Sequence, residues 1–532
     1  MRIVYTCLIP VVILCTDCTT KSTKPALTTR DTTITQANSF SELFLDSTLL
    51  ESFITNHKVG DSAANRLRSF YNSRNYQFAW FTEEGLAEQA RAFWNLHNSY
   101  VQVSNDSSFI DKQLHEQMQL LINEDTTISG DPKQIAETEL RLTEHFFEYA
   151  QHAYVGKVNP DELQWHIPRK KVNAMALLDS LVSSKGQNIE QWEPINPQYN
   201  LMNKELMRYH EIEKAGGWEQ ISLGKKKSYR IGDVSLAIKQ VKRRLFAVGD
   251  LTAIDTSEIF TPELSAATKQ AQKRFGLKQD GIINVDLIDN LNEPITNRIQ
   301  QMLINMERMR WMPKEAQGNR IIANIPEYKL HVFENAKKVF DIDIVVGTEA
   351  NKTVVFNDIL KYVVFSPYWN IPRSIVRNEI QPAMRKNPNY LARNNMEQTG
   401  SSNGLPVIRQ KPGGSNALGR VKFIFPNSYS IYFHDTPAKS LFNKQKRAFS
   451  HGCIRLAEPK KLAEYLLRNQ PEWTPLEINE AMKDSKEKWV TIKEPIPVII
   501  TYFTAWVSND GLLNFRDDIY GHDKRLKLHL FE

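Results

Sequence analysis

The chain has 532 residues, of which 41% are hydrophobic and 24% are charged, and its formal net charge is +6. This length is too great for one hydrophobic core, so we expect about two to four domains. The composition is that of an ordinary globular protein, and the small net charge without dense Lys/Arg runs argues against nucleic-acid binding.

The N-terminus has the pattern of an export signal. Arg2 precedes an apolar run at residues 3–14, which is too short to cross a bilayer because a spanning helix needs about 20 apolar residues. Cys15 or Cys18 is a candidate lipidated first residue of the mature chain. A cleaved signal and an uncleaved membrane anchor are the alternatives.

Residues 39–228 have a mainly helical pattern. Apolar side chains recur three and four residues apart, as at Leu50, Phe53 and Ile54. We expect the aromatic cluster Tyr76-Phe78-Trp80-Phe81 to belong to a core, and we find no catalytic grouping in this region.

The pattern changes at residues 229–295, where short amphipathic helices alternate with Gly-Asp and Asp-Gly turns. Thr261 should cap a helix that begins at Pro262, because its side-chain oxygen can accept from the unpaired N–H groups of the first turn. We expect a small helical domain here.

From residue 320 onward, apolar residues alternate with period two and predict many short strands, which indicates a sheet-on-sheet domain. One predicted hairpin runs from Arg420 to His434 across Pro426-Asn427. Residues 373–414 interrupt this pattern with helical spacing and then polar residues. An insertion of this length is usually functional or disordered.

The segment Ser450-His451-Gly452-Cys453 holds the one cysteine that follows the signal segment. Cysteines of exported proteins usually pair, so a single one is either buried and inert or kept for its reactivity. A thiol is a good nucleophile only as thiolate and needs a nearby base; His434 and His451 are candidates. Gly452 would let the backbone approach a reacting carbonyl.

The same residue types are also zinc ligands. However, His-x-Cys with one distant His lacks the paired spacing of zinc sites. We expect no metal and no cofactor.

These motifs resemble those of a known family. A histidine, a spacer of fifteen residues and Ser-His-Gly-Cys resemble the signature of the L,D-transpeptidases, the YkuD-type cysteine enzymes of bacterial peptidoglycan. The blocks at 366–372 and 416–437 resemble the large, multidomain Gram-negative (YcbB-like) branch. Residues 229–295 resemble a peptidoglycan-binding domain, with a plain helical linker domain as the alternative, and residues 39–228 resemble the scaffold domain of that branch.

The resemblance implies a multidomain α+β protein. A mostly helical scaffold and a small three-helix peptidoglycan-binding-like domain would precede a C-terminal β-sandwich catalytic domain with an inserted helical and loop lid. The expected boundaries are a signal segment at 1–18, a flexible tether at 19–38, the scaffold at 39–228, the peptidoglycan-binding-like domain at 229–295 and the catalytic domain at 296–532. Within the catalytic domain, residues 373–414 would form a mobile, substrate-capping lid over Cys453.

The resemblance also implies roles for the site residues. Cys453 would be the nucleophile that forms a thioester, and His434 its general base and acid, with one ring nitrogen held by a backbone carbonyl such as that of Asp435. The N–H groups of Cys453 and of Gly452 or His451 would form an oxyanion hole. Candidate substrate-binding residues are Arg455, Ser450, Tyr432, Trp369 and Asn416.

The implied activity is transfer of an acyl group from a tetrapeptide stem to an amine, with release of D-Ala, which forms 3→3 cross-links. The partners would be peptidoglycan stem peptides and glycan, and we expect a periplasmic monomer whose Cys453 reacts with carbapenems. An L,D-carboxypeptidase, D-amino-acid exchange and a non-catalytic wall-binding scaffold are alternatives. Arg455 would bind a substrate carboxylate or brace the loop, and the aromatic residues would line the donor groove or belong to the core.

Overall fold

The computed structural model describes residues 27–104, 106, 109–123, 131–314, 318–335 and 337–531. The chain divides into two compact units. The predicted signal segment and its cysteines lie outside the described residues. The first unit consists of Met1–Asn95, Asp111–Phe147 and Met175–Ile189, and the second of Leu96–Ile110, Glu148–Ala174 and Glu190–Glu532.

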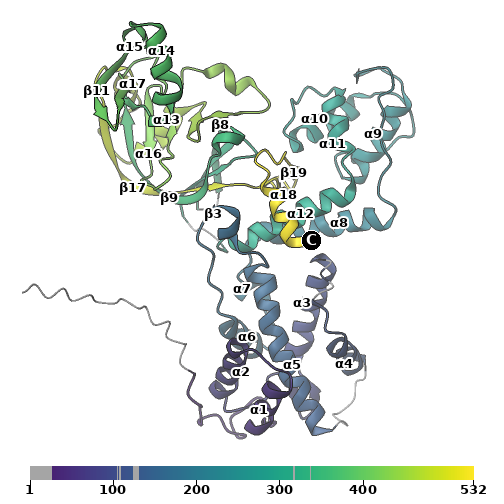
Figure 1. Ribbon diagram of the computed structural model, residues 1–532. Helices are drawn as coiled ribbons and strands as arrows, with labels where there is room; N and C mark the ends of the chain where they lie inside the picture. Colours follow the sequence, from purple (N-terminus) through teal and green to yellow (C-terminus); the bar gives the residue numbers. More distant parts are fainter. Residues whose placement is uncertain are drawn as a thin grey trace, which may run out of the picture. The chain divides into compact units, whose positions relative to one another are not determined.

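The N-terminal region is helical, as predicted (Figure 1, purple to blue). Asp46 begins the first helix because its side chain accepts a hydrogen bond from Thr48 N. Phe78, Trp80 and Phe81 are buried, which confirms most of the predicted aromatic cluster. The elements are α1 (Ser47–Asn56), α2 (Asp61–Ser73), β1 (Phe81–Thr82), β2 (Gly85–Leu86), α3 (Glu88–Ser104), α4 (Lys112–Asn123), α5 (Pro132–Ala150), η2 (Gln151–Val155), η3 (Pro160–Leu163), β3 (Trp165–His166), α6 (Ala174–Ser183), α7 (Ile189–Trp192) and α8 (Pro197–Lys214).

A small three-helix domain follows, as predicted. Thr261 caps the helix that begins at Pro262, and its side chain accepts from Leu264 N. The three helices share a core that includes Val241, Ala271 and other buried aliphatic residues. The elements are β4 (Ser228–Tyr229), α9 (Leu236–Ala247), α10 (Pro262–Arg274), β5 (Ile283–Asn284) and α11 (Val285–Leu291), with β4 and β5 paired.

The C-terminal region forms a strand-rich domain whose sheet closes on itself. Within the described residues the strands follow the order β13-β14-β16-β8-β7-β6-β17-β9, and β9 also pairs with β13. The two layers expected of a sandwich are therefore joined at both edges, and the alternating apolar residues fill the interior. The strands are β6 (Arg320–Asn324), β7 (Lys329–Glu334), β8 (Lys337–Gly347), β9 (Val355–Phe365), β13 (Val421–Ile424), β14 (Phe433–His434), β15 (Ala448–Ser450), β16 (Ile454–Leu456) and β17 (Lys488–Thr501).

Further elements flank this sheet. β18 pairs with β19 beyond the end of β17, and a long helix, α12, leads into the domain from the three-helix domain. The bounds are α12 (Ile295–Trp311), η4 (Glu349–Asn351), η6 (Lys439–Asn443), α16 (Pro459–Leu467), α17 (Pro475–Lys483), β18 (Ala505–Val507), β19 (Leu513–Phe515) and α18 (His522–Phe531).

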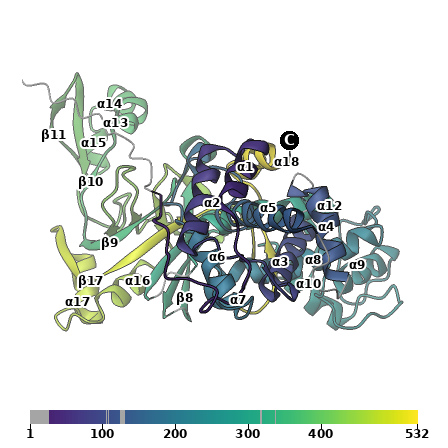
Figure 2. The same cartoon turned by 90° about the horizontal axis from the view of Figure 1, so that it is seen from below.

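The predicted insertion lies between β9 and β13 and has its own small core around Ile375, Ile380 and Ile408. In both Figure 1 and Figure 2, α13, α14 and α15 lie close to β11. The helices follow the predicted spacing, but the polar second half, expected as loop, is a hairpin. Asn403 and Gly404 both have positive φ at its tip, which suits a tight two-residue turn. The elements are β10 (Trp369–Asn370), α13 (Arg373–Ile375), η5 (Val376–Ile380), α14 (Gln381–Lys386), α15 (Tyr390–Arg393), β11 (Met396–Ser402) and β12 (Leu405–Gln410).

Candidate active site

Strand pairing brings the two candidate catalytic residues together. The loop that carries Cys453 joins β15 to β16, and both strands pair with β8. β14 pairs with β16 so that His434 lies opposite Arg455. Because Arg455 is two residues from Cys453, this register brings the imidazole close to the nucleophile loop.

The imidazole of His434 is held in one tautomer and in its neutral form. Its side chain is buried, and Nδ1–H donates to Asp435 O at 2.5 Å. Since a carbonyl can only accept, Nδ1 carries the proton and Nε2 keeps its lone pair. Burial, and then the positive charge of Arg455, lower the pKa of His434 to about 3. The ring is therefore neutral at physiological pH.

The thiol of Cys453 is also neutral at rest. Burial raises the pKa of Cys453, and this effect outweighs the opposing effects of Tyr432 and Arg455. Its Sγ–H donates to Ser430 O at 3.5 Å. Within the described residues the structure shows no hydrogen bond between Sγ and His434.

Hydrogen bonds inside the loop narrow the choice of oxyanion donors. Gly452 has a φ of +110°, a conformation that favours glycine. Its N–H donates to Ser450 Oγ at 3.2 Å, and Ser450 Oγ donates to Cys453 O at 2.6 Å. Gly452 N is thus engaged, contrary to its expected place in the oxyanion hole, and Cys453 N and His451 N are the remaining candidates. The side chain of Ser450 is buried, and its hydroxyl is engaged by the loop's own backbone. Ser450 therefore has no free hydroxyl for the expected contact with substrate.

The other predicted residues differ in how accessible they are. Arg455 is half-buried, and its Nε has no hydrogen-bond partner among the described residues. The ring of Tyr432 lies 5.7 Å from that of His434, and burial followed by the charge of Cys453 raises the pKa of Tyr432. Trp369 is half-buried in the insertion. Asn416, by contrast, is fully buried and donates to backbone carbonyls, which suits the shaping of a loop rather than contact with substrate.

Two further residues contact the nucleophile loop although the sequence did not single them out. Thr353 Oγ1 donates to Gly452 O at 2.7 Å. Glu379, in the insertion, lies with Oε1 3.5 Å from Nε2 of the exposed His451. Nothing in the local sequence marks either residue, because each reaches the loop only through the fold. His451 thus faces the predicted lid and not the thiol.

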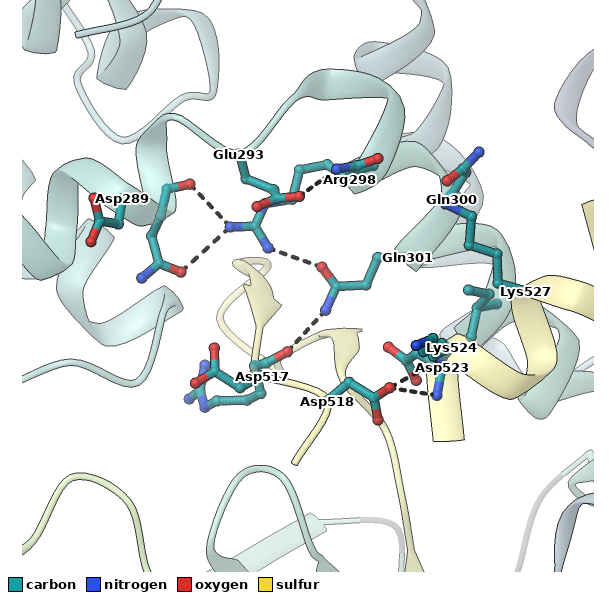
Figure 3. A pocket seen from close by; sticks show the side chains of 14 residues that line it. Asp289, Glu293, Arg298, Gln300, Gln301, Asp517, Asp518, Asp523, Lys524 and Lys527 are labelled. Carbon is teal, nitrogen blue, oxygen red and sulfur yellow. Dashed lines mark hydrogen bonds between the residues drawn. The ribbon is translucent and has the colours of Figure 1, made fainter. Parts of the chain in front are cut away.

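A polar cleft of about 420 Å³ lies elsewhere in the second unit (Figure 3). Its walls are α11, α12, α18 and the segment that leads into α18. Arg298 donates to Gln301 at 2.9 Å and to Asn290 O at 3.0 Å, and Gln301 donates to Arg516 O at 2.9 Å. These bonds join the three-helix domain to the strand-rich domain, and the cleft does not contain Cys453. No group of three or more metal-ligating side chains occurs among the residues described.

A thiol on a loop close to a neutral imidazole of fixed tautomer, with an unengaged backbone N–H at the thiol residue, is an arrangement suited to acyl transfer. Comparison with protein families supports this description. Residues 318–492 match the L,D-transpeptidase catalytic domain model, called YkuD. Residues 235–291 match the model described as "Putative peptidoglycan binding domain", and residues 65–206 match the scaffold domain model. The chain carries a YkuD-type L,D-transpeptidase catalytic domain, preceded by a scaffold domain and a peptidoglycan-binding domain.

One curated relative agrees with this assignment. Over 248 residues the chain is 33% identical to a Haemophilus influenzae protein named "Putative L,D-transpeptidase", covering 44% of this chain and 50% of that protein. The matched segment therefore spans about half the length of the curated relative.

Solved structures add less. An L,D-transpeptidase from Mycobacterium smegmatis is 11% identical, covers 34% of this chain and 58% of its own, and has a TM-score of 0.20. One from Xylanimonas cellulosilytica is 12% identical, covers 53% and 100%, and has a TM-score of 0.19. TM-scores this low do not establish a shared fold for the whole chain.

Proposed function

We propose that this protein is an exported L,D-transpeptidase that acts on peptidoglycan through a thioester on Cys453. The observation that carries the proposal is the register of β14 and β16. It brings His434, with Nδ1 bonded to Asp435 O, to the loop of the only cysteine in the described part of the chain. The catalytic-domain match over residues 318–492 supports it.

In the acylation step Cys453 attacks the carbonyl that joins the third residue of a tetrapeptide stem to D-Ala. The thiol proton passes to His434 Nε2 as the Sγ–C bond forms, and the carbonyl oxygen becomes an oxyanion that Cys453 N–H stabilises. When the C–N bond breaks, the nitrogen of D-Ala takes the proton from His434. A neutral thiol and a neutral imidazole are the protonation states that this sequence requires.

In the second step an amine replaces the sulfur. The neutral imidazole of His434 accepts a proton from the incoming amine, the new amide bond forms, and Cys453 leaves and recovers its proton. The diamino acid of a second stem is the proposed acceptor, which gives a 3→3 cross-link. Water, a D-amino acid or a protein amine would enter by the same route.

The surroundings of the site support peptide binding. Arg455 has a buried Nε without a partner, and an arginine suits a substrate carboxylate because its planar guanidinium can donate two parallel hydrogen bonds. Tyr432 and Trp369 are proposed to line the donor groove under the lid at 373–414. The peptidoglycan-binding domain would hold the glycan, and a wall substrate places the protein outside the cytoplasm. Among the described residues no helix is both long and apolar enough to cross a membrane.

Intact-mass spectrometry tests the proposal. The protein is incubated with a carbapenem and, separately, with a disaccharide-tetrapeptide. We expect a drug adduct on Cys453, loss of D-Ala and a cross-linked dimer, all absent in Cys453→Ala and unchanged in Ser485→Ala, which alters an exposed serine of the same domain. Tripeptide without dimer would identify water as the acceptor and make the protein a carboxypeptidase. No adduct and no loss of D-Ala would refute catalysis and favour a wall-binding scaffold.

A further inference from the structure

Two buried hydroxyl groups, those of Thr353 and Tyr520, support the loop that carries Cys453. Thr353 is 1% exposed; its Oγ1 donates to Gly452 O at 2.7 Å and accepts from Gly347 N at 3.0 Å. Tyr520, which is also 1% exposed, donates to Gly347 O at 2.6 Å and accepts from Thr353 N at 3.3 Å. The two hydroxyls thus connect Gly452 to the end of β8.

This connection sets the direction of one peptide group. In a trans peptide the carbonyl and the following N–H point to opposite sides of the chain. Since Gly452 O is directed at Thr353, the N–H of Cys453 must point away from Thr353 and the protein interior. Cys453 N makes no hydrogen bond within the described residues, so it is available to a reacting carbonyl oxygen.

We propose that Thr353, held by Tyr520, is a positioning residue that aims the Cys453 N–H at the oxyanion. This proposal rests on the proposed acyl transfer, and it adds the side chain that orients the oxyanion donor. Neither hydroxyl bonds to Cys453 Sγ or to His434 in the structure. Both should therefore matter for attack on a carbonyl and not for the reactivity of the thiol itself.

Tyr520 lies in a part of the chain that the catalytic-domain model does not cover, since the match ends at residue 492. Tyr520 N donates to Tyr502 OH at 2.8 Å, and Lys352 Nζ donates to Tyr520 O at 2.7 Å. The rings of Tyr502 and Tyr520 stack with their centroids 5.7 Å apart. The segment after β17 thereby becomes part of the support of the site.

Two reactions of the Cys453 sulfur distinguish a loss of Cys453 N–H positioning from a general disturbance of the site. Acylation by a carbapenem creates an oxyanion, whereas alkylation by iodoacetamide is a substitution at a saturated carbon and creates none. The purified full chain is compared with Thr353→Val, which removes the hydroxyl at similar size, and with Thr353→Ser, which keeps it. Thr491→Val removes an exposed hydroxyl from β17 and serves as the control.

We expect Thr353→Val to slow acylation by roughly 10- to 100-fold, in line with the loss of a well-placed oxyanion donor. Alkylation at pH 9 should stay within about twofold of the wild type, because it needs no such donor. Thr353→Ser should recover most of the acylation rate, and Tyr520→Phe should slow acylation without slowing alkylation. If Thr353→Val does not fold, as judged by circular dichroism, the tyrosine variant provides the same comparison.

Equal acylation by Thr353→Val and the wild type would overturn the inference while leaving the proposed function intact. An equal loss of both reactions would also overturn it, since the hydroxyl would then order the thiol and not the N–H. A wild-type protein that alkylates but never acylates would refute the proposed function itself.

Discussion

Cys453 and His434 are expected to rest as two neutral groups and not as a thiolate–imidazolium pair. The pKa of the thiol lies above its ordinary value of 9.0, and that of the imidazole lies at about 3. Each group therefore favours its neutral form, and proton transfer from sulfur to nitrogen is unfavourable in the resting protein. The thiolate–imidazolium pair should therefore be a minor species of the resting protein.

His434→Ala tests this description because the two reactions of Cys453 depend on it differently. Alkylation needs a preformed thiolate, so its rate should rise about tenfold per pH unit from pH 6 to 9, and loss of His434 should hardly change it. Acylation lets His434 take the proton as the bond to sulfur forms, so the variant should lose about 10²- to 10⁴-fold in rate.

The assay follows adduct mass against time between pH 5 and 9.5, with iodoacetamide in one series and a carbapenem in the other. His529→Ala, which removes an exposed histidine of α18, should behave as the wild type in both. A wild-type alkylation rate that is already on a plateau below pH 7, and that falls in His434→Ala, would show a standing ion pair and refute the reasoning.

Three other predictions concern stability and substrate. His331 lies between two carboxylates, one of them Asp341, and its pKa is raised to about 9. Because the pKa in the folded protein exceeds the unfolded value of 6.5, His331 should contribute about 3 kcal/mol to the free energy of unfolding below pH 6.5. This contribution should be lost as the pH rises through 9. Calorimetry should therefore show His331→Gln melting well below the wild type at pH 6 and near it at pH 10; equal differences at both would contradict this. Arg274→Met leaves Asp250 buried without its partner at 2.5 Å, and should destabilise the protein by about 3–5 kcal/mol; an unchanged melting temperature would refute the pairing. Arg455→Gln should lower kcat/KM about 10- to 100-fold for a tetrapeptide but little for its C-terminal amide; equal losses would argue for a bracing role.

Local patterns predicted the elements whose causes are local. The helix at Pro262 starts where the threonine cap and the proline placed it. β6 and β7 follow the period-two alternation that their sequences show. The hairpin β11–β12 escaped prediction because the residues of β11 are mostly exposed and polar. Cross-strand backbone bonds and the Asn403-Gly404 turn therefore define this strand more than any apolar pattern does.

The candidate site was predictable only where one short motif carries the chemistry. His434 and Cys453 stand out by residue type and spacing, whereas Thr353 and Tyr520 are an ordinary threonine and tyrosine far away in the chain. Their positions follow from how the sheet closes and from where the last segment packs. The engagement of Gly452 N by Ser450 Oγ likewise depends on one side-chain rotamer, which no sequence pattern specifies.

The four residues of the Ser-His-Gly-Cys motif point in different directions, and this explains why each type is needed. The hydroxyl of Ser450 turns inward and bonds to the loop's own backbone. His451 turns outward to Glu379 of the insertion, so it cannot be the base and instead connects the loop to the proposed lid. Gly452 adopts the positive φ that lets its carbonyl face the interior. Cys453 follows in a loop that strand pairing brings close to His434, and its N–H makes no hydrogen bond within the described residues; a thiol and a free N–H are the two groups that the proposed acyl transfer requires from one residue.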